Sequence, residues 1–212
     1  MARPVRGHPC FAAVYDWLTG PWERAENLAR RRALLAPCAG DVLDAGCGTG
    51  ANLPVFAELA RAGRTLRVQA ADPDPHMLRR AGRRAARLGL PVRLLDAPAE
   101  DLPLADASCD FVACTLVLCT AGRPAAALAE LARVLRPGGR LLFLEHVGSG
   151  HPRAAALQAR LRRPWACLAG GCRLDAATDA LLRAAPFAEV HWEEEALPPP
   201  LYRLLRGWAR KA

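Results

Sequence analysis

The stretch Val42-Leu43-Asp44-Ala45-Gly46-Cys47-Gly48-Thr49-Gly50 decides the fold of this 212-residue chain. A short apolar run ends in three glycines at every second position, and a helical pattern follows over 52–62. Glycine makes such a turn readily, and its missing side chain lets a ligand lie against the peptide groups. The free N–H groups at the start of the helix attract a carboxylate or a phosphate. The stretch therefore predicts a strand, a ligand-binding turn and a helix.

The rest of the chain repeats this alternation of strands and helices. Strands are predicted over 41–45, 65–71, 91–95, 110–118, 140–147, 188–195 and 202–209. Helices are predicted over 23–35, 52–62, 75–88, 125–135, 152–163 and 176–185, with a further short helix within 11–22. This order indicates an α/β fold: a Rossmann-like, doubly wound and mostly parallel seven-stranded sheet. Helices cover both faces, and the last strand is expected to be antiparallel.

Composition limits the classes of function. A chain of this length forms one domain, and 52% hydrophobic with 24% charged residues excludes disorder. The net charge of +8 is spread along the chain without a compact basic run, so no nucleic-acid partner is expected. No apolar run is long enough for a membrane span and the first ten residues lack the pattern of a signal peptide, which predicts a cytoplasmic protein. Its eight cysteines, none in a C-x-x-C pair, are expected to be reduced and mostly buried, and no metal site is predicted.

The residues around the glycines discriminate between two nucleotide cofactors. The stretch satisfies the dinucleotide fingerprint G-x-G-x-x-G/A, because Ala51 fills the last place. Asp44, however, stands just before the glycines, where an acid repels a pyrophosphate but suits the ammonium group of a methionine moiety. Asp72 closes the second strand and can take ribose hydroxyls of either cofactor, whereas 96–101 is placed to bracket an adenine. The combination favours S-adenosylmethionine over a dinucleotide.

These motifs, in this order, resemble class I S-adenosylmethionine-dependent methyltransferases over residues 40–147. A closer resemblance is to the alkyl-thiol S-methyltransferases, the methyltransferase-like seven family, from about Tyr15 to the end of the chain. It rests on Cys114-Thr-Leu-Val-Leu-Cys119, on Glu145-His146-Val147 and on Gly171-Cys172. This resemblance implies an enzyme that converts S-adenosyl-L-methionine to S-adenosyl-L-homocysteine while it methylates a small, apolar thiol.

The expected site follows from the motifs and the resemblance together. A single domain over 1–212 is predicted, with an N-terminal helical lid at 1–36 and an acceptor-side insertion at 148–186. His146, at the carboxyl end of a strand, is the candidate general base. The predicted cofactor-binding residues are Tyr15, Asp44, Gly46, Cys47, Gly48, Thr49, Gly50, Asn52, Asp72, Pro73, Met77, Ala99, Glu100, Cys114, Thr115 and Leu116.

Several alternatives stay open at this level. His146 can equally be a structural histidine at a strand end. Bacterial phospholipid N-methyltransferases share the glycine motif and an early Tyr15-Asp16, so phosphatidylethanolamine is a second acceptor, and a quinone methylated on carbon is a third. A non-catalytic domain that only binds S-adenosylmethionine is also consistent with the motifs. The arginines of 148–186 form either a peripheral contact with an anionic membrane or a solvated face.

Overall fold

The computed structural model describes residues 21–212, and their side chains from Glu26 onward. Tyr15 and most of the helix predicted over 11–22 lie outside the described residues, as does most of the predicted lid. Within the described part, no helix is both long and apolar enough to cross a membrane.

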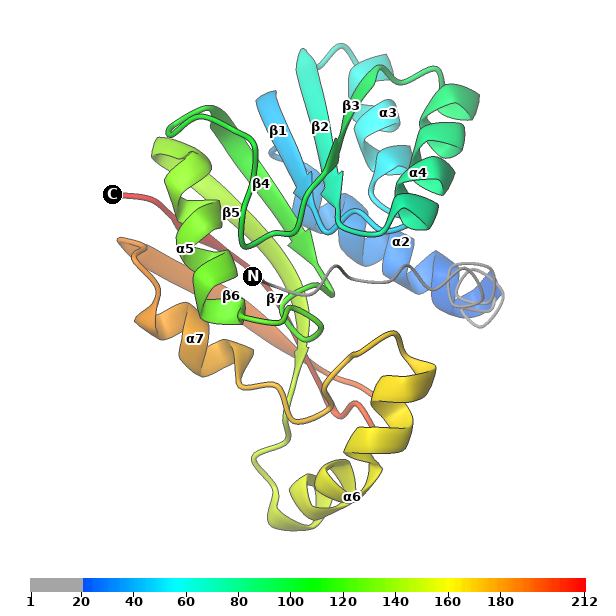
Figure 1. Cartoon of the computed structure of the whole chain (residues 1–212), viewed down its shortest axis with the longest axis vertical. Helices are drawn as coiled ribbons and strands as arrows, with labels where there is room; N and C mark the ends of the chain where they lie inside the picture. The colour runs from blue at the N-terminus through cyan, green and yellow to red at the C-terminus, as the bar shows by residue number, and fades with distance from the viewer. Residues whose placement is uncertain (1–20) are drawn as a thin grey trace.

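A seven-stranded sheet forms the centre of the molecule (Figure 1). Its strands are β1 (Gly40–Ala45), β2 (Leu66–Asp72), β3 (Val92–Asp96), β4 (Cys109–Thr115), β5 (Leu135–Val147), β6 (Glu189–Ala196) and β7 (Arg203–Arg210). They lie in the order β3-β2-β1-β4-β5-β7-β6, with β1 to β5 parallel and β7 antiparallel to both of its neighbours. The predicted fold class is confirmed. The strand order reverses between β1 and β4, which is where sheets of this kind bind their ligands.

Helices cover both faces of the sheet (Figure 1). They are α2 (Pro21–Leu35), α3 (Leu53–Arg61), α4 (Pro75–Leu88), α5 (Pro124–Val134), α6 (Pro152–Leu168) and α7 (Thr178–Ala184). Side chains of α2, α3 and α4, such as Phe56, join one buried cluster, whereas α5 and α7 join another through residues such as Leu131. Alternate residues of β5 enter the two clusters, with Phe143 in one and Leu144 in the other. Period-two alternation thus places apolar side chains on both faces of a central strand.

Three predicted element ends were wrong by three residues or more. The fifth strand begins at Leu135 and not at 140, so the predicted turn at 137–139 is part of it. The fourth strand ends at Thr115 and not at 118, because Leu116 takes a left-handed φ of 60° and the chain turns away from the sheet. The helix predicted over 152–163 continues to Leu168 through Pro164. A proline inside a helix leaves the carbonyl four residues before it without its N–H partner. Pro164 and Arg160 are both exposed, so water can satisfy that carbonyl.

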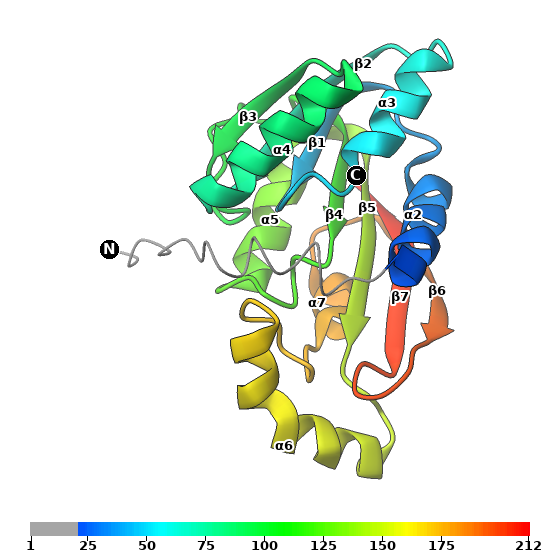
Figure 2. The same ribbon diagram turned by 90° about the vertical axis from the view of Figure 1, so that its right-hand side faces the viewer.

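The segment 148–186 holds α6 and α7, and α6 lies beyond the carboxyl end of β5 (Figure 2). This segment therefore extends the edge of the sheet where the glycine turn also lies. Its role in acceptor recognition stays a prediction.

Candidate functional site

The glycine turn joins β1 to α3 and carries three left-handed residues. Gly46, Gly48 and Gly50 have φ values of 62°, 55° and 82°. A Cβ at Gly46 would lie 2.5 Å from Val117 Cγ2, whereas a Cβ at Gly48 would meet nothing within 4 Å. Gly46 is thus required by packing against the loop after β4. Gly48 faces open space, as a cradle for a ligand requires.

Asp72 ties this turn to the end of β2. Its Oδ2 accepts the N–H of Gly48 at 2.9 Å and its Oδ1 accepts that of Asp74 at 2.9 Å. Burial raises the pKa of Asp72 above its ordinary value. Each carboxylate oxygen has a second lone pair, so both remain able to accept from the hydroxyls of a ribose.

A buried polar network lies behind the turn, at the carboxyl ends of β1 and β4. Asn52 Nδ2 donates to Asp44 Oδ1 at 2.7 Å and to Thr115 Oγ1 at 3.1 Å. Arg31 of α2 donates from Nη1 to Asn52 Oδ1 and to Thr115 Oγ1, both at 2.6 Å. The structure thus brings together three predicted site residues and adds Arg31, which the sequence analysis missed.

Asp44 is the acid of this network whose carboxylate can still accept a hydrogen bond. Its side chain is fully buried, and Oδ2 has no hydrogen-bond partner within residues 21–212. Burial raises its pKa to about 7, although the bond from Asn52 and the charge of Arg31 oppose the rise. A buried carboxylate oxygen without a partner is costly. The arrangement fits a cationic ligand group such as the ammonium of S-adenosylmethionine.

The remaining predicted cofactor residues lie around the same edge. Met77, Ala99, Cys114 and Thr49 are buried, and Pro73 is half-buried. Glu100 Oε1 accepts the N–H of Arg123 at 3.1 Å, so this carboxylate already supports the loop before α5. Burial raises the pKa of the Cys47 thiol, which makes it a poor nucleophile. Contacts of these positions with the cofactor stay a prediction.

Glu145 shapes the loop that follows β4. It is fully buried, and its carboxylate accepts the N–H groups of Val117 at 2.7 Å, Leu118 at 3.0 Å and Cys119 at 3.4 Å. Burial raises its pKa to about 7. The loop that packs on Gly46 and carries Cys119 is therefore held in place by one acid of β5. The sequence motif contained Glu145, but no role was assigned to it.

His146, the predicted base, lies in a cluster with two cysteines. Its Nε2 is 2.7 Å from Cys172 Sγ, and Trp165 Nε1 donates to the same sulfur at 3.2 Å. Cys119, also buried, completes the cluster. The thiol of Cys119 and the imidazole of His146 lower the pKa of Cys172. Cys119 and Cys172 are buried as predicted, and Ala176 packs with them, but His146 and Trp165 also bring polar nitrogens to the sulfur of Cys172.

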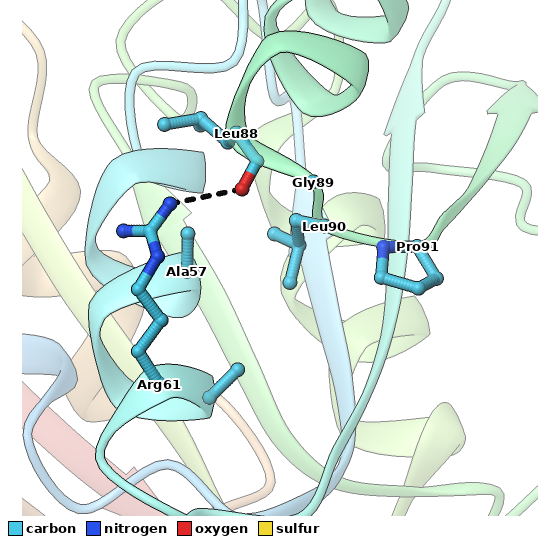
Figure 3. Close-up of a pocket in the computed structure, with 7 residues that line it drawn as sticks. Ala57, Arg61, Leu88, Gly89, Leu90 and Pro91 are labelled. Atoms are coloured by element: carbon cyan, nitrogen blue, oxygen red, sulfur yellow. Dashed lines mark hydrogen bonds between the residues drawn. The ribbon is translucent and has the colours of Figure 1, made fainter.

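A hollow in the surface lies at the opposite edge of the sheet (Figure 3). It is lined by Ala57 and Arg61 of α3 and by Leu88 to Pro91, where Arg61 Nη2 donates to Leu88 O at 2.9 Å. Pro91 directly precedes β3, so the hollow lies at the amino end of that strand. It is therefore separate from the glycine turn and from the cysteine–histidine cluster.

Comparisons with known proteins agree with this fold. A family model described as a methyltransferase domain matches residues 43–143. A phosphatidylethanolamine N-methyltransferase of Cereibacter sphaeroides is 30% identical over 71% of this chain and 72% of its own length. The crystal structure of a SAM-dependent methyltransferase from Aquifex aeolicus superimposes with a TM-score of 0.70 at 20% identity, covering 98% of this chain and 100% of that one. The chain belongs to the class I S-adenosylmethionine-dependent methyltransferases.

Within this class, the chain is similar to human thiol S-methyltransferase TMT1B, with 39% identity over 164 residues. The match covers 76% of this chain and 64% of the human protein, so the chain spans somewhat less than two thirds of that relative. The closer family resemblance stated from the motifs is confirmed.

Replacement of Arg31 by alanine tests the buried network behind the glycine turn. Loss of the guanidinium leaves buried oxygens of Asn52 and Thr115 without that donor and removes a cation near Asp44. We expect affinity for S-adenosylmethionine, measured by calorimetry, to fall about 5- to 150-fold, because such unsatisfied groups cost about 1–3 kcal/mol. Arg32, whose exposed side chain pairs with Glu58, is the matched control. An equal loss in Arg32→Ala would contradict a specific role for Arg31.

Proposed function

We propose that this chain transfers a methyl group from S-adenosylmethionine to the sulfur of a small, rather apolar thiol. The observation that carries the proposal is the 39% identity with a relative named as a thiol S-methyltransferase, over three quarters of the chain. The geometry supports it, because a cysteine–histidine cluster lies beyond the carboxyl ends of β4 and β5. Acceptors of such sheets bind at that edge.

The cofactor, when bound, supplies a methyl group already activated on a sulfonium. The chain itself then has to position donor and acceptor in line and keep water away. We assign Asp44 to the ammonium group, Asp72 to the ribose, and the open backbone at Gly48 to the close approach of the ligand. Glu145 fixes the loop after β4, which we place between the cofactor and the acceptor.

A thiol must lose its proton to react, because the thiolate is the nucleophile and a free thiol has a pKa of about 8.5. His146 is the residue that we propose to act on this proton. Its Nε2 is engaged with Cys172, whereas Nδ1 is buried and, among the described residues, has no hydrogen-bond partner. A direct proton transfer therefore requires Nδ1. Nε2 already shares a hydrogen bond with the sulfur of Cys172, so it can move a proton only along that bond.

The proposal is tested by methyl transfer from labelled S-adenosylmethionine to a panel of small thiols, each matched by its alcohol analogue. We expect S-methyl product with the apolar thiols and none with the alcohols, identified by mass spectrometry. A quinone precursor and liposomes of phosphatidylethanolamine are assayed in parallel. Product on the lipid nitrogen or the quinone carbon would replace the thiol proposal. No product on any acceptor, with cofactor bound by calorimetry, would favour the non-catalytic alternative.

The same liposomes address a peripheral membrane contact of this protein, which we propose to be cytoplasmic. Helix α6 has exposed Arg160 and Arg163 beside Leu157 and Leu168, whose exposed fractions are 38% and 69%. Basic and apolar side chains on one helix suit an anionic membrane surface. Sedimentation with anionic vesicles at low salt supports this contact. Equal sedimentation with neutral vesicles would contradict it.

A further inference from the structure

Cys119, His146 and Cys172 come from three separate segments and meet in one buried cluster. Their exposed fractions are 1%, 3% and 8%. The two sulfurs and the imidazole nitrogen all lie within 4.8 Å of one another. Within the described residues, this is the group of such side chains whose donor atoms converge closely enough to hold one ion. We propose that these three side chains bind a zinc ion.

The donor set is the chemical argument for zinc. Two thiolates and one imidazole are soft and borderline ligands, and this combination selects zinc over magnesium or calcium. Bonds of about 2.3 Å to sulfur and 2.0 Å to nitrogen in a tetrahedron keep the ligand atoms roughly 3.5–3.8 Å apart. The three donor atoms lie within 4.8 Å of one another, close to these separations. The distance between His146 Nε2 and Cys172 Sγ is 2.7 Å and has to increase by about 1 Å when the ion binds.

The cluster is held together by contacts outside the donor atoms. Arg173 joins the two cysteine-bearing segments: its backbone N–H and its Nε donate to Cys119 O at 3.0 and 3.2 Å, and its Nη2 donates to Leu118 O and Ala121 O at 3.0 and 3.1 Å. Trp165 donates to Cys172 Sγ. Hydrogen bonds of this kind orient metal ligands and tune the ion.

Three protein ligands leave a fourth tetrahedral position, as in catalytic zinc sites. This further step rests on the proposed function. The acceptor thiol binds there as a thiolate and its proton leaves to water. The thiolate electron pair forms the new carbon–sulfur bond to the methyl group, and the sulfonium carbon–sulfur bond breaks with its pair retained on S-adenosylhomocysteine. With zinc bound, His146 is a ligand to the ion through Nε2, and this role replaces the proton transfer proposed for it above, while methyl transfer to a thiol is kept.

Metal binding is measured first and needs no enzymatic activity. Purified full-length chain is incubated with zinc, desalted and analysed by atomic emission, and cobalt(II) is used as a spectroscopic probe. We expect about one zinc per chain and a thiolate-to-cobalt charge-transfer band. Cys119→Ser, Cys172→Ser and His146→Gln should each weaken zinc affinity more than tenfold in competition with a chromogenic chelator.

The matched control is Cys167→Ser, because Cys167 is an exposed cysteine on α6 close to the cluster in sequence. It should bind zinc like the wild type. Circular dichroism melting shows whether each variant folds. Absence of zinc and of the cobalt band from the folded, reduced wild-type protein would overturn the site, as would retention of both in a folded Cys119→Ser, Cys172→Ser double variant. Formation of a Cys119–Cys172 disulfide under reducing conditions would also overturn it.

The role of the ion is tested separately. We expect chelation to reduce thiol methylation at least 100-fold while calorimetric binding of S-adenosylmethionine is kept, and added zinc to restore the rate. Full activity of the zinc-free protein would overturn the role but leave the proposed function standing. Stoichiometric zinc with no thiol methylation would overturn the role and the proposed function while the site itself stands.

Discussion

Gly46→Ala is expected to lower the free energy of unfolding by about 3 kcal/mol, as the sum of a left-handed backbone and a close contact. The φ of 62° costs an L-residue with a Cβ roughly 1–2 kcal/mol. The new methyl would also lie 2.5 and 2.7 Å from the two methyl carbons of Val117, whose backbone N–H is held by Glu145. Denaturant unfolding followed by circular dichroism measures the change.

Gly48→Ala is the control that separates stability from binding. Its backbone has a similar φ of 55°, but the added Cβ meets no protein atom within 4 Å. We expect it to cost about 1 kcal/mol in stability and more than tenfold in cofactor affinity, since the methyl group enters the cradle. Gly48→Ala with unchanged affinity for S-adenosylmethionine would contradict the placement of the cofactor on this turn. Equal unfolding midpoints for the two variants would contradict the role of Val117.

The affinity for S-adenosylmethionine is expected to fall about 50-fold between pH 7 and pH 5, because Asp44 must be ionised to bind an ammonium group. Burial raises the pKa of Asp44 in the free protein to about 7, and a bound cation lowers it again. Cofactor binding therefore releases a proton below pH 7. Calorimetry in buffers of different ionisation enthalpy measures both the affinity and the proton.

The stability of the free protein should change with pH in the opposite sense. The pKa of Asp44 is about 7 in the folded state and 3.8 in the unfolded state. The contribution of the neutral carboxyl to stability is thus complete below pH 3.8 and is lost as the pH rises through 7. Asp72 also has a raised pKa and lies near Asp44, so its titration has to be separated.

Two controls make this separation. 5′-Methylthioadenosine keeps the ribose, which we assign to Asp72, but lacks the amino-acid part. Its affinity should therefore stay constant between pH 5 and pH 7, where Asp44 changes its protonation. Asp44→Asn should flatten the profile for S-adenosylmethionine itself. A steep profile for 5′-methylthioadenosine, or an unchanged one for Asp44→Asn, would move the effect to another group.

The fold could be predicted from local patterns because strands buried on both faces leave short continuous apolar runs and amphipathic helices leave periodic ones. Pro75–Leu88 was predicted at both ends, since prolines and glycines mark its limits. The end of β4 could not be predicted, because Val117 and Leu118 are as apolar as the strand before them. They leave the sheet because their N–H groups bond to Glu145, a residue far along the chain.

The site was predictable where its residues are contiguous and not where they meet through the fold. The glycine turn is contiguous in sequence. Arg31 lies between Arg30 and Arg32, and nothing local distinguishes the three. Successive helix residues point about 100° apart, so Arg30 reaches Glu195, Arg32 reaches Glu58 and Arg31 is buried. The cysteine–histidine cluster was missed for the same reason, because its spacing in the chain matches no metal motif.

The contacts of Arg173 have a consequence for how acceptor preference can be changed. This one residue, at the end of the segment after α6, supplies the hydrogen bonds that attach that segment to the carbonyls of the loop after β4. The surface of α6 is otherwise largely exposed. The exposed positions of 152–168 can therefore be varied in a search for other acceptors. Gln158 and Trp165, whose side chains bond to Ser149 and Cys172, have to be kept together with Arg173 and the cofactor half.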